Sequence, residues 1–439
     1  MRGRCRSALL SLAIAGAGTF FWQAATPTTF DRFAQQFTSA YAEMDPDPYV
    51  LEFKDRLGNI PPENILIQCQ QFFQQQKDRL AHFDREKLSE DQQSEAALIA
   101  YMIQRHQEQL DIELAWSKAG RPAATRGLEG MPEKDRWYRW LIKRYTSTGV
   151  APQEVKEIGL QEVTRCRQEL DRLATELQLS PEEFLETLAS DLSVITDKQQ
   201  LLSGFNTLDS VVRMNLKSFI EVDDIDPVHA MEWPGAGANT PPGIYLPMEQ
   251  NPYGHDVFQF NFHGGRFNIR NLGWLYLHEA IPGHHLQSSI RRKLPHSDLR
   301  AHLVEGGNFE GWACYVEYHG DLLGAYSDRW QEVGKWEWDL VRSARLVLDI
   351  GIHAEGWSRE DALRYWRENI PGQDAIAERE VDRVTAMPGQ VLSYKVGAAK
   401  IEQLKHAYLE ADRSRTDKDF HLAFLQAGQI PLEVIANYL

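Results

Sequence analysis

The chain is organised around residues 272–287, which read Leu-Gly-Trp-Leu-Tyr-Leu-His-Glu-Ala-Ile-Pro-Gly-His-His-Leu-Gln. Three histidines, His278, His284 and His285, and one glutamate, Glu279, fall within eight residues. Neutral imidazole is the commonest metal ligand in proteins, and a carboxylate beside a metal ligand can act as a general base. The stretch therefore predicts a metal site rather than an ordinary polar helix.

The spacing of the histidines is not that of a standard zinc helix. In His-Glu-x-x-His the two ligands lie one helical turn apart. The histidines after His278 come later, and in a straight helix they would point about 120° away or lie about 10.5 Å along the axis. Proline interrupts helical hydrogen bonding and glycine tolerates unusual backbone angles. We therefore predict that Pro282 and Gly283 form a bulge that brings His284 to the second ligand position, with His285 as the alternative ligand or an outer group.

A catalytic zinc ion usually has three protein ligands and one open position. The segment 304–312 holds two acidic candidates for the third ligand. Glu310 opens a helical stretch that can lie antiparallel to the first helix, and Glu305 is the alternative. Either residue alone would also fit an ordinary acidic helix start.

Outside these segments the apolar spacing predicts a mainly α-helical protein. Ser89 and Ser180 have the sequence context of helix caps. The predicted helices of the first half are 28–43, 63–84, one capped by Ser89, 137–145, 151–177, one that follows Ser180, and 198–221. The chain is helical again from residue 272 onward.

A short β segment interrupts the helices. Residues 256–269 alternate between apolar and polar side chains, which predicts a strand with one apolar face. Gly264-Gly265 resembles a turn, so 257–269 is predicted as a hairpin beside the zinc helix. The strand 257–263 is also a candidate edge on which an extended peptide could add as a further strand.

The first 25 residues have the arginines and the apolar run of a signal peptide, so we expect export to the periplasm or the outside of the cell. Residues 8–25 could instead stay as a membrane anchor, the only membrane contact that we expect. We divide the rest into a helical part, 26–221, and a zinc-bearing part, 222–439. The net charge of −16 argues against nucleic acid as a partner, and the widely spaced cysteines argue against a disulfide framework. Nothing in the sequence indicates an oligomeric state.

Four segments together resemble a known family. They are His278–Gln287, Glu310-Gly-Trp-Ala313, Arg342–His353 and Pro388–Gly397. In this order they are similar to the bacterial DUF885 proteins, which are regarded as zinc metallopeptidases distantly similar to thimet oligopeptidase and carboxypeptidase Taq. The resemblance spans roughly residues 130–410, and the N-terminal third departs from it.

The resemblance implies a multi-helical, channel-bearing gluzincin fold. It implies one zinc ion held by His278, His284 and Glu310, with Glu279 as the general base. The Gly-His pair of the thimet-type motif aligns with Gly283-His284, which favours His284 over His285.

The later motif segments supply candidates for the remaining chemistry. Hydrolysis of an amide creates an oxyanion that needs hydrogen-bond donors, and Tyr394 and His353 are the best candidates. Tyr245 is a weaker one and, with Arg345 and Gln390, is a candidate contact for substrate. Arg345 and Asp349 also have the i, i+4 spacing of an ion pair.

The sequence therefore predicts an exported zinc metallopeptidase that acts on peptides. Two alternatives remain. The same residues would serve a zinc hydrolase of a non-peptide amide or ester, and a non-catalytic envelope binding protein could have the same fold.

Overall fold

The helices of the first half follow the predicted pattern, and two of them begin at the predicted capping residues. The computed structural model describes residues 29–43, 51–190, 193–296 and 298–439, so the predicted signal peptide lies outside the described residues. Ser89 accepts a hydrogen bond from the backbone of Gln92, and Ser180 from that of Glu183. The helices are α2 Phe30–Glu43, α3 Phe53–Asn59, α4 Glu63–Ala81, α5 Glu90–Lys118, α6 Lys134–Thr146, α7 Pro152–Glu176, α8 Pro181–Ala189 and α9 Lys198–Asn215.

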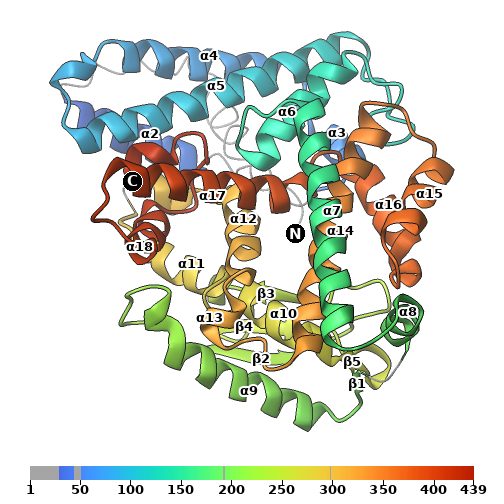
Figure 1. Ribbon diagram of the computed structural model, residues 1–439. Coiled ribbons are helices and arrows are strands. Elements are labelled where there is room, and N and C mark those ends of the chain that lie inside the picture. The colour runs from blue at the N-terminus through green and yellow to red at the C-terminus, as the bar shows by residue number, and fades with distance from the viewer. Residues whose placement is uncertain (1–28, 44–50, 191–192, 297) are drawn as a thin grey trace.

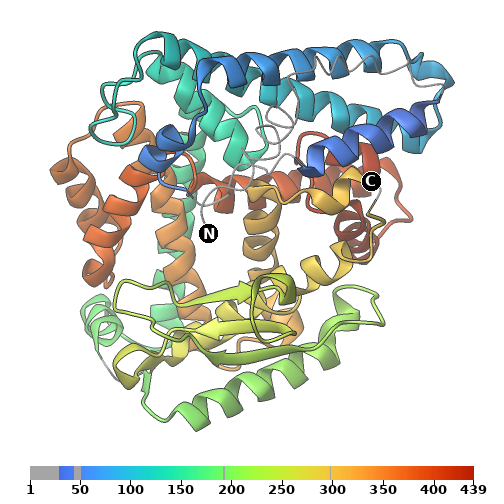
Figure 2. The ribbon, with the colours of Figure 1, turned by 180° about the vertical axis from the view of Figure 1, so that it is seen from behind.

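The structure has two small sheets, and the larger lies between α9 and the motif segment (Figure 1). The larger has the strand order β2-β4-β3, with β2 (Val228–Glu232) parallel and β3 (Gly243–Leu246) antiparallel to β4 (Asp256–Phe260). The smaller pairs β1 (Val194–Ile195) with β5 (Phe267–Asn268). Figure 2 shows the larger sheet from behind, with α9 beneath it.

The predicted hairpin is wrong, and so is the predicted free edge. The chain leaves β4 at residue 260, turns at Gly264 and Gly265, and pairs β5 with β1 instead of with β4. β4 has a neighbour on each side, so it presents no free edge. Every residue of β4 is buried, so it does not have the predicted polar face.

The second half is again helical. The helices are α10 Leu272–Glu279, α11 His284–Arg291, α12 Gly306–Glu317, α13 Gly320–Leu323, α14 Arg329–His353, α15 Arg359–Asn369, α16 Ala377–Ala386, α17 Leu392–Ala411 and α18 Asp417–Ala427. Helices from both sides of the predicted boundary at residue 222 pack together: α7 lies along α14, and α6 contacts α17 (Figure 1). The protein is mainly α-helical with two small sheets. The predicted mainly α-helical fold class is therefore confirmed.

Glycines let α12 and α17 approach each other closely. A Cβ atom on Gly397 would lie 2.1 Å from the backbone oxygen of Gly307, and one on Gly311 would lie 2.6 Å from the Cα of Gly397. No larger residue fits at this crossing without moving a helix. The crossing fixes Glu310, on α12, relative to Tyr394, on α17.

The described part of the chain contains no helix with both the length and the apolar character that crossing a membrane requires.

Candidate metal centre

The motif segment is two helices rather than one. α10 ends at Glu279 and α11 begins at His284, and the peptide bond between Ile281 and Pro282 is cis. The predicted interruption at Pro282-Gly283 is confirmed, but it is a complete break and not a bulge within a continuous helix. A Cβ atom on Gly283 would lie 2.0 Å from the carbonyl oxygen of His278, so only glycine fits there.

The break turns His284 back toward His278. The Nε2 atoms of His278 and His284 lie 3.4 and 3.5 Å from Oε2 of Glu310, and all three residues are buried. The two imidazole rings are nearly perpendicular, with centroids 4.7 Å apart, and Phe309 stacks on the ring of His284. The structure therefore brings together the three residues that the sequence offered as ligands.

The spacing of these atoms suits a metal ion. Atoms bonded tetrahedrally to zinc at about 2.0–2.1 Å lie about 3.3 Å from one another, close to the two observed separations. Among the described residues, Oε2 of Glu310 has no hydrogen-bond partner. A buried carboxylate oxygen without a partner is costly unless a cation compensates for it. The residues present thus fit a small divalent cation.

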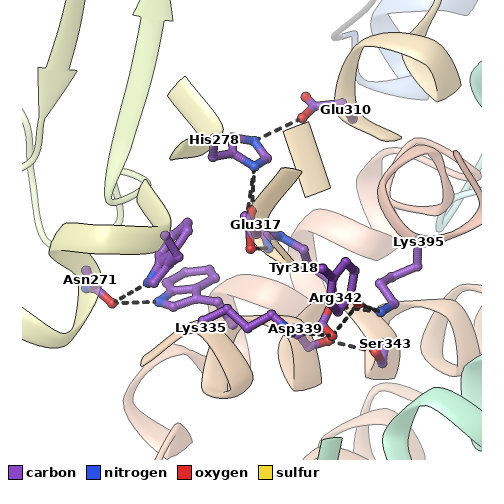
Figure 3. A network of polar contacts seen from close by, with 12 residues as sticks. Asn271, His278, Glu310, Glu317, Tyr318, Lys335, Asp339, Arg342, Ser343 and Lys395 are labelled. Atoms are coloured by element: carbon purple, nitrogen blue, oxygen red, sulfur yellow. Dashed lines mark hydrogen bonds and ion pairs between the residues drawn. The ribbon is translucent and has the colours of Figure 1, made fainter. Parts of the chain in front are cut away.

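Glu317 orients His278 from the other side. Nδ1 of His278 lies 2.7 Å from Oε1 of Glu317, whose second oxygen accepts a hydrogen bond of 2.7 Å from Arg342 (Figure 3). A protonated Nδ1 that donates to Glu317 leaves the lone pair of Nε2 directed at Glu310. Ligand histidines almost always have such a carboxylate or carbonyl partner.

A second group of potential ligands, His278, Cys314 and Glu317, also lies within reach of one ion. The separation of 2.7 Å between His278 and Glu317 is that of a hydrogen bond and is shorter than the spacing of two ligands on one ion. We therefore assign Glu317 to the support of His278 rather than to the ion.

The ionisable groups of this cluster shift one another's pKa values. Burial lowers the pKa of His278, but its contacts with Cys314, Glu310 and Glu317 outweigh burial and raise the pKa well above its usual value. For Glu310, burial raises the pKa, and the two histidines outweigh it and hold the pKa far below its usual range. The cluster thus favours an ionised Glu310 with positive charge beside it.

Glu279 and His285 flank the cluster and have different surroundings. Oε2 of Glu279 accepts a hydrogen bond of 2.8 Å from the backbone nitrogen of Tyr245 on β3. His285 faces away from the other histidines, with Nδ1 3.0 Å from Asp256 and Nε2 2.8 Å from the carbonyl of Asp226. His285 is therefore not brought into either group of potential ligands.

Glu305 also lies outside both groups. Its two carboxylate oxygens accept hydrogen bonds of 2.5 and 2.8 Å from the guanidinium of Arg105, and one of them also accepts from Ser147 at 3.0 Å. All three groups are buried. Glu305 thus joins α12 to the N-terminal helices, and its prediction as an alternative ligand does not fit the structure.

Of the two predicted oxyanion donors, only Tyr394 lies near the cluster. Its ring stacks on that of His278 with centroids 6.4 Å apart, and its hydroxyl accepts a hydrogen bond of 3.3 Å from Arg383. His353 lies at the far end of α14, where Nε2 is 3.0 Å from the carbonyl of Val384. His353 belongs to the core, because the helix carries it several turns beyond Arg342.

The three predicted substrate contacts have structural partners. The hydroxyl of Tyr245 accepts from Arg292 at 3.5 Å, and the side chain of Gln390 accepts from Arg383 at 3.0 Å. Arg345 pairs with Glu380 at 2.7 Å.

The ion pair expected between Arg345 and Asp349 does not form. The carboxylate of Asp349 accepts instead from the hydroxyl of Tyr138 at 2.6 Å and from the backbone of Gly389 at 3.0 Å.

Sequence reasoning missed Cys314 and Glu317 as members of the site, placed Arg342 in a network with Arg345 and Asp349 instead of pairing it with Glu317, and assigned no role to Arg383. Glu317 follows Glu310 by seven positions, two turns along one helix, so it lies on the same face. That spacing is the one signal that could have identified it. Cys314 lies one turn after Glu310 on the same face.

Comparisons with solved structures bear on the fold, and a family model identifies the family. No curated protein matches the sequence. A candidate lipoprotein from Colwellia psychrerythraea matches the fold with a TM-score of 0.65 and 21% identity, over 92% of this chain and 74% of that one. A candidate lipoprotein of unknown function from Shewanella oneidensis matches with a TM-score of 0.71 and 16% identity, over 93% and 99%. The model of the bacterial proteins of unknown function DUF885 matches residues 59–439, so the chain belongs to the DUF885 family.

Proposed function

We propose that the protein is a zinc-dependent hydrolase that cleaves peptide bonds, with His278, His284 and Glu310 as the metal ligands. The observation that carries this proposal is the approach of two imidazole nitrogens to one unpartnered carboxylate oxygen, at 3.4 and 3.5 Å. Two nitrogens and one oxygen form a donor set typical of catalytic zinc sites. When bound, zinc would polarise the scissile carbonyl and lower the pKa of a water molecule.

Glu279 acts as the general base in this proposal. It follows His278 directly, and a hydrogen bond from Tyr245 holds one of its oxygens. Its other oxygen can take the proton of the attacking water and deliver it to the leaving amine. Burial of Glu279 limits its rotation, which helps to keep the carboxylate aimed at the reacting atoms.

Tyr394 supplies the hydrogen bond to the oxyanion. Burial and the negative charge of Glu310 raise the pKa of Tyr394, so the phenol keeps its proton at neutral pH. Removal of one such donor costs about 10²–10³ in rate in other hydrolases. His353 has no part in this mechanism because its ring lies in the core.

The proposal favours peptides as substrates. It also includes a gluzincin-like fold. Export is proposed on the pattern of residues 1–25, and the description of both structural neighbours as candidate lipoproteins supports it.

The test is the variant Glu279→Gln, which has the same shape and cannot accept the proton. It should bind one zinc per chain, as the wild type should, and lose hydrolysis of a peptide panel. Hydrolysis by the variant at the wild-type rate would contradict the mechanism. Wild-type activity on esters or acylated amino acids alone would favour the non-peptide hydrolase, and the lack of stoichiometric zinc would favour a binding protein.

A further inference from the structure

Arg383, on α16, lies beside the tyrosine of the proposed site. One of its terminal nitrogens, Nη2, donates to the hydroxyl of Tyr394 at 3.3 Å and to the side chain of Gln390 at 3.0 Å. The side chain is half-buried. Arginine has five N–H donors in a planar fork, so most of its donors are left for another acceptor.

Glu380, which precedes Arg383 by three residues on α16, is already neutralised. One oxygen of Glu380 pairs with Arg345 at 2.7 Å and the other with Arg379 at 2.8 Å. Within the part of the chain that the structure describes, no carboxylate oxygen forms an ion pair within 4.0 Å with Arg383. Glu380 therefore has two guanidinium partners of its own and does not pair with Arg383.

A half-buried guanidinium without an ion-pair partner is unusual, because a partly desolvated charge is costly when it is unpaired. Its planar fork matches a carboxylate, which can accept two parallel hydrogen bonds from it. We propose that Arg383 binds the C-terminal carboxylate of a peptide substrate, so that the enzyme releases C-terminal residues one at a time. This inference rests on the proposed function of the metal site.

The position of Arg383 fits this role. In a peptide that loses its last residue, three covalent bonds with a summed length of about 4.3 Å separate the scissile carbonyl carbon from the terminal carboxylate carbon. The oxyanion and the terminal carboxylate must therefore bind to neighbouring side chains. Tyr394 and Arg383 are such neighbours, since they share a hydrogen bond.

The same chemistry would recognise an acidic side chain just after the scissile bond, so the experiment separates the two sources. Three pools of N-acetylated tetrapeptides are compared: one with a free C terminus, one amidated, and one amidated with aspartate or glutamate as the last residue. Cleavage rates are measured by mass spectrometry with the wild type. Binding of the same pools is measured with the zinc-loaded Glu279→Gln protein, which needs no turnover.

We expect the wild type to cleave the free-acid pool at least about tenfold faster than the amidated pool, releasing only the last residue, and binding to show the same preference. Arg383→Gln should remove the preference in both measurements, and Arg383→Lys should keep part of it. Arg379→Gln is the matched control. It removes a charge beside Glu380 and leaves the contact with Tyr394, so the preference should survive. Melting temperatures establish that each variant is folded.

Equal binding and equal cleavage of the acid and amide pools by the wild type would overturn the inference. So would the same loss of preference in Arg379→Gln as in Arg383→Gln. A preference for the amidated acidic pool would overturn the assignment to the C terminus. If no pool is cleaved and the binding preference still depends on Arg383, the proposed hydrolysis fails and the carboxylate site stands.

Discussion

Replacing Gly283 with alanine should destroy the metal site without touching a ligand. The added Cβ would lie 2.0 Å from the carbonyl oxygen of His278 and 2.3 Å from that of Leu277, where real Cβ contacts are not shorter than 3.0 Å. The backbone before His284 must therefore move by at least about 1 Å. Metal–ligand distances tolerate only about 0.2 Å, so His278 and His284 can no longer bind the same ion well.

The expected loss of zinc affinity is at least about 100-fold, because changes that only disturb the support of a ligand already cost 10–100-fold. Competition with a fluorescent zinc chelator measures it. Gly58→Ala is the matched control, since Gly58 is an exposed helical residue with nothing within 4 Å of an added Cβ. The control should bind zinc normally and gain about 0.5–1 kcal/mol of stability. Wild-type zinc affinity in a folded Gly283→Ala protein would refute the reasoning.

Three further outcomes are expected. Glu317→Gln should weaken zinc binding by about 10–100-fold through its effect on His278; unchanged affinity in the chelator assay would show that Glu317 does not support the ligand. Burial lowers the pKa of His353 from 6.5 to about 4, so the unfolded chain binds more protons between these values and stability falls as the pH drops. In metal-free protein, protonation of His353 should lower the free energy of unfolding by up to about 3 kcal/mol between pH 7 and pH 4. His353→Gln should remove this pH dependence in urea titrations and leave catalysis in place. An unchanged pH dependence in the variant would contradict the assignment of His353 to the core. Glu305→Gln should destabilise the protein by about 3–5 kcal/mol, because Arg105 loses its buried partner, with unchanged zinc affinity; loss of zinc with normal stability would restore Glu305 as a ligand.

The sequence predicted the helices well because their signals are local. Caps such as Ser89 and Ser180 act on the turn that follows them, and apolar spacing is a property of one helix. The sheet pairing was not predictable in this way, because β5 pairs with β1, far away in the sequence. The alternation in 256–269 is a local pattern. It could not show that the partner strand of β5 comes from a helix-rich region of the chain.

The site was predictable to the extent that it lies in one motif. Pro282-Gly283 indicated the break, and the ligand candidates followed from the motif and the resemblance. The partners of those residues depend on helix packing, so the sequence did not show that Glu317 supports His278. His353 was placed wrongly because a residue in a motif-like segment was assumed to face the site. The length of α14 carries it away into the core.

The most direct test of the proposed metal centre is an anomalous-scattering map collected at the zinc absorption edge from crystals of the protein grown with zinc. We predict one strong peak in contact with Nε2 of His278, Nε2 of His284 and Oε2 of Glu310. A peak between Cys314 and Glu317, a peak on His285, or no peak near His278 would contradict the account.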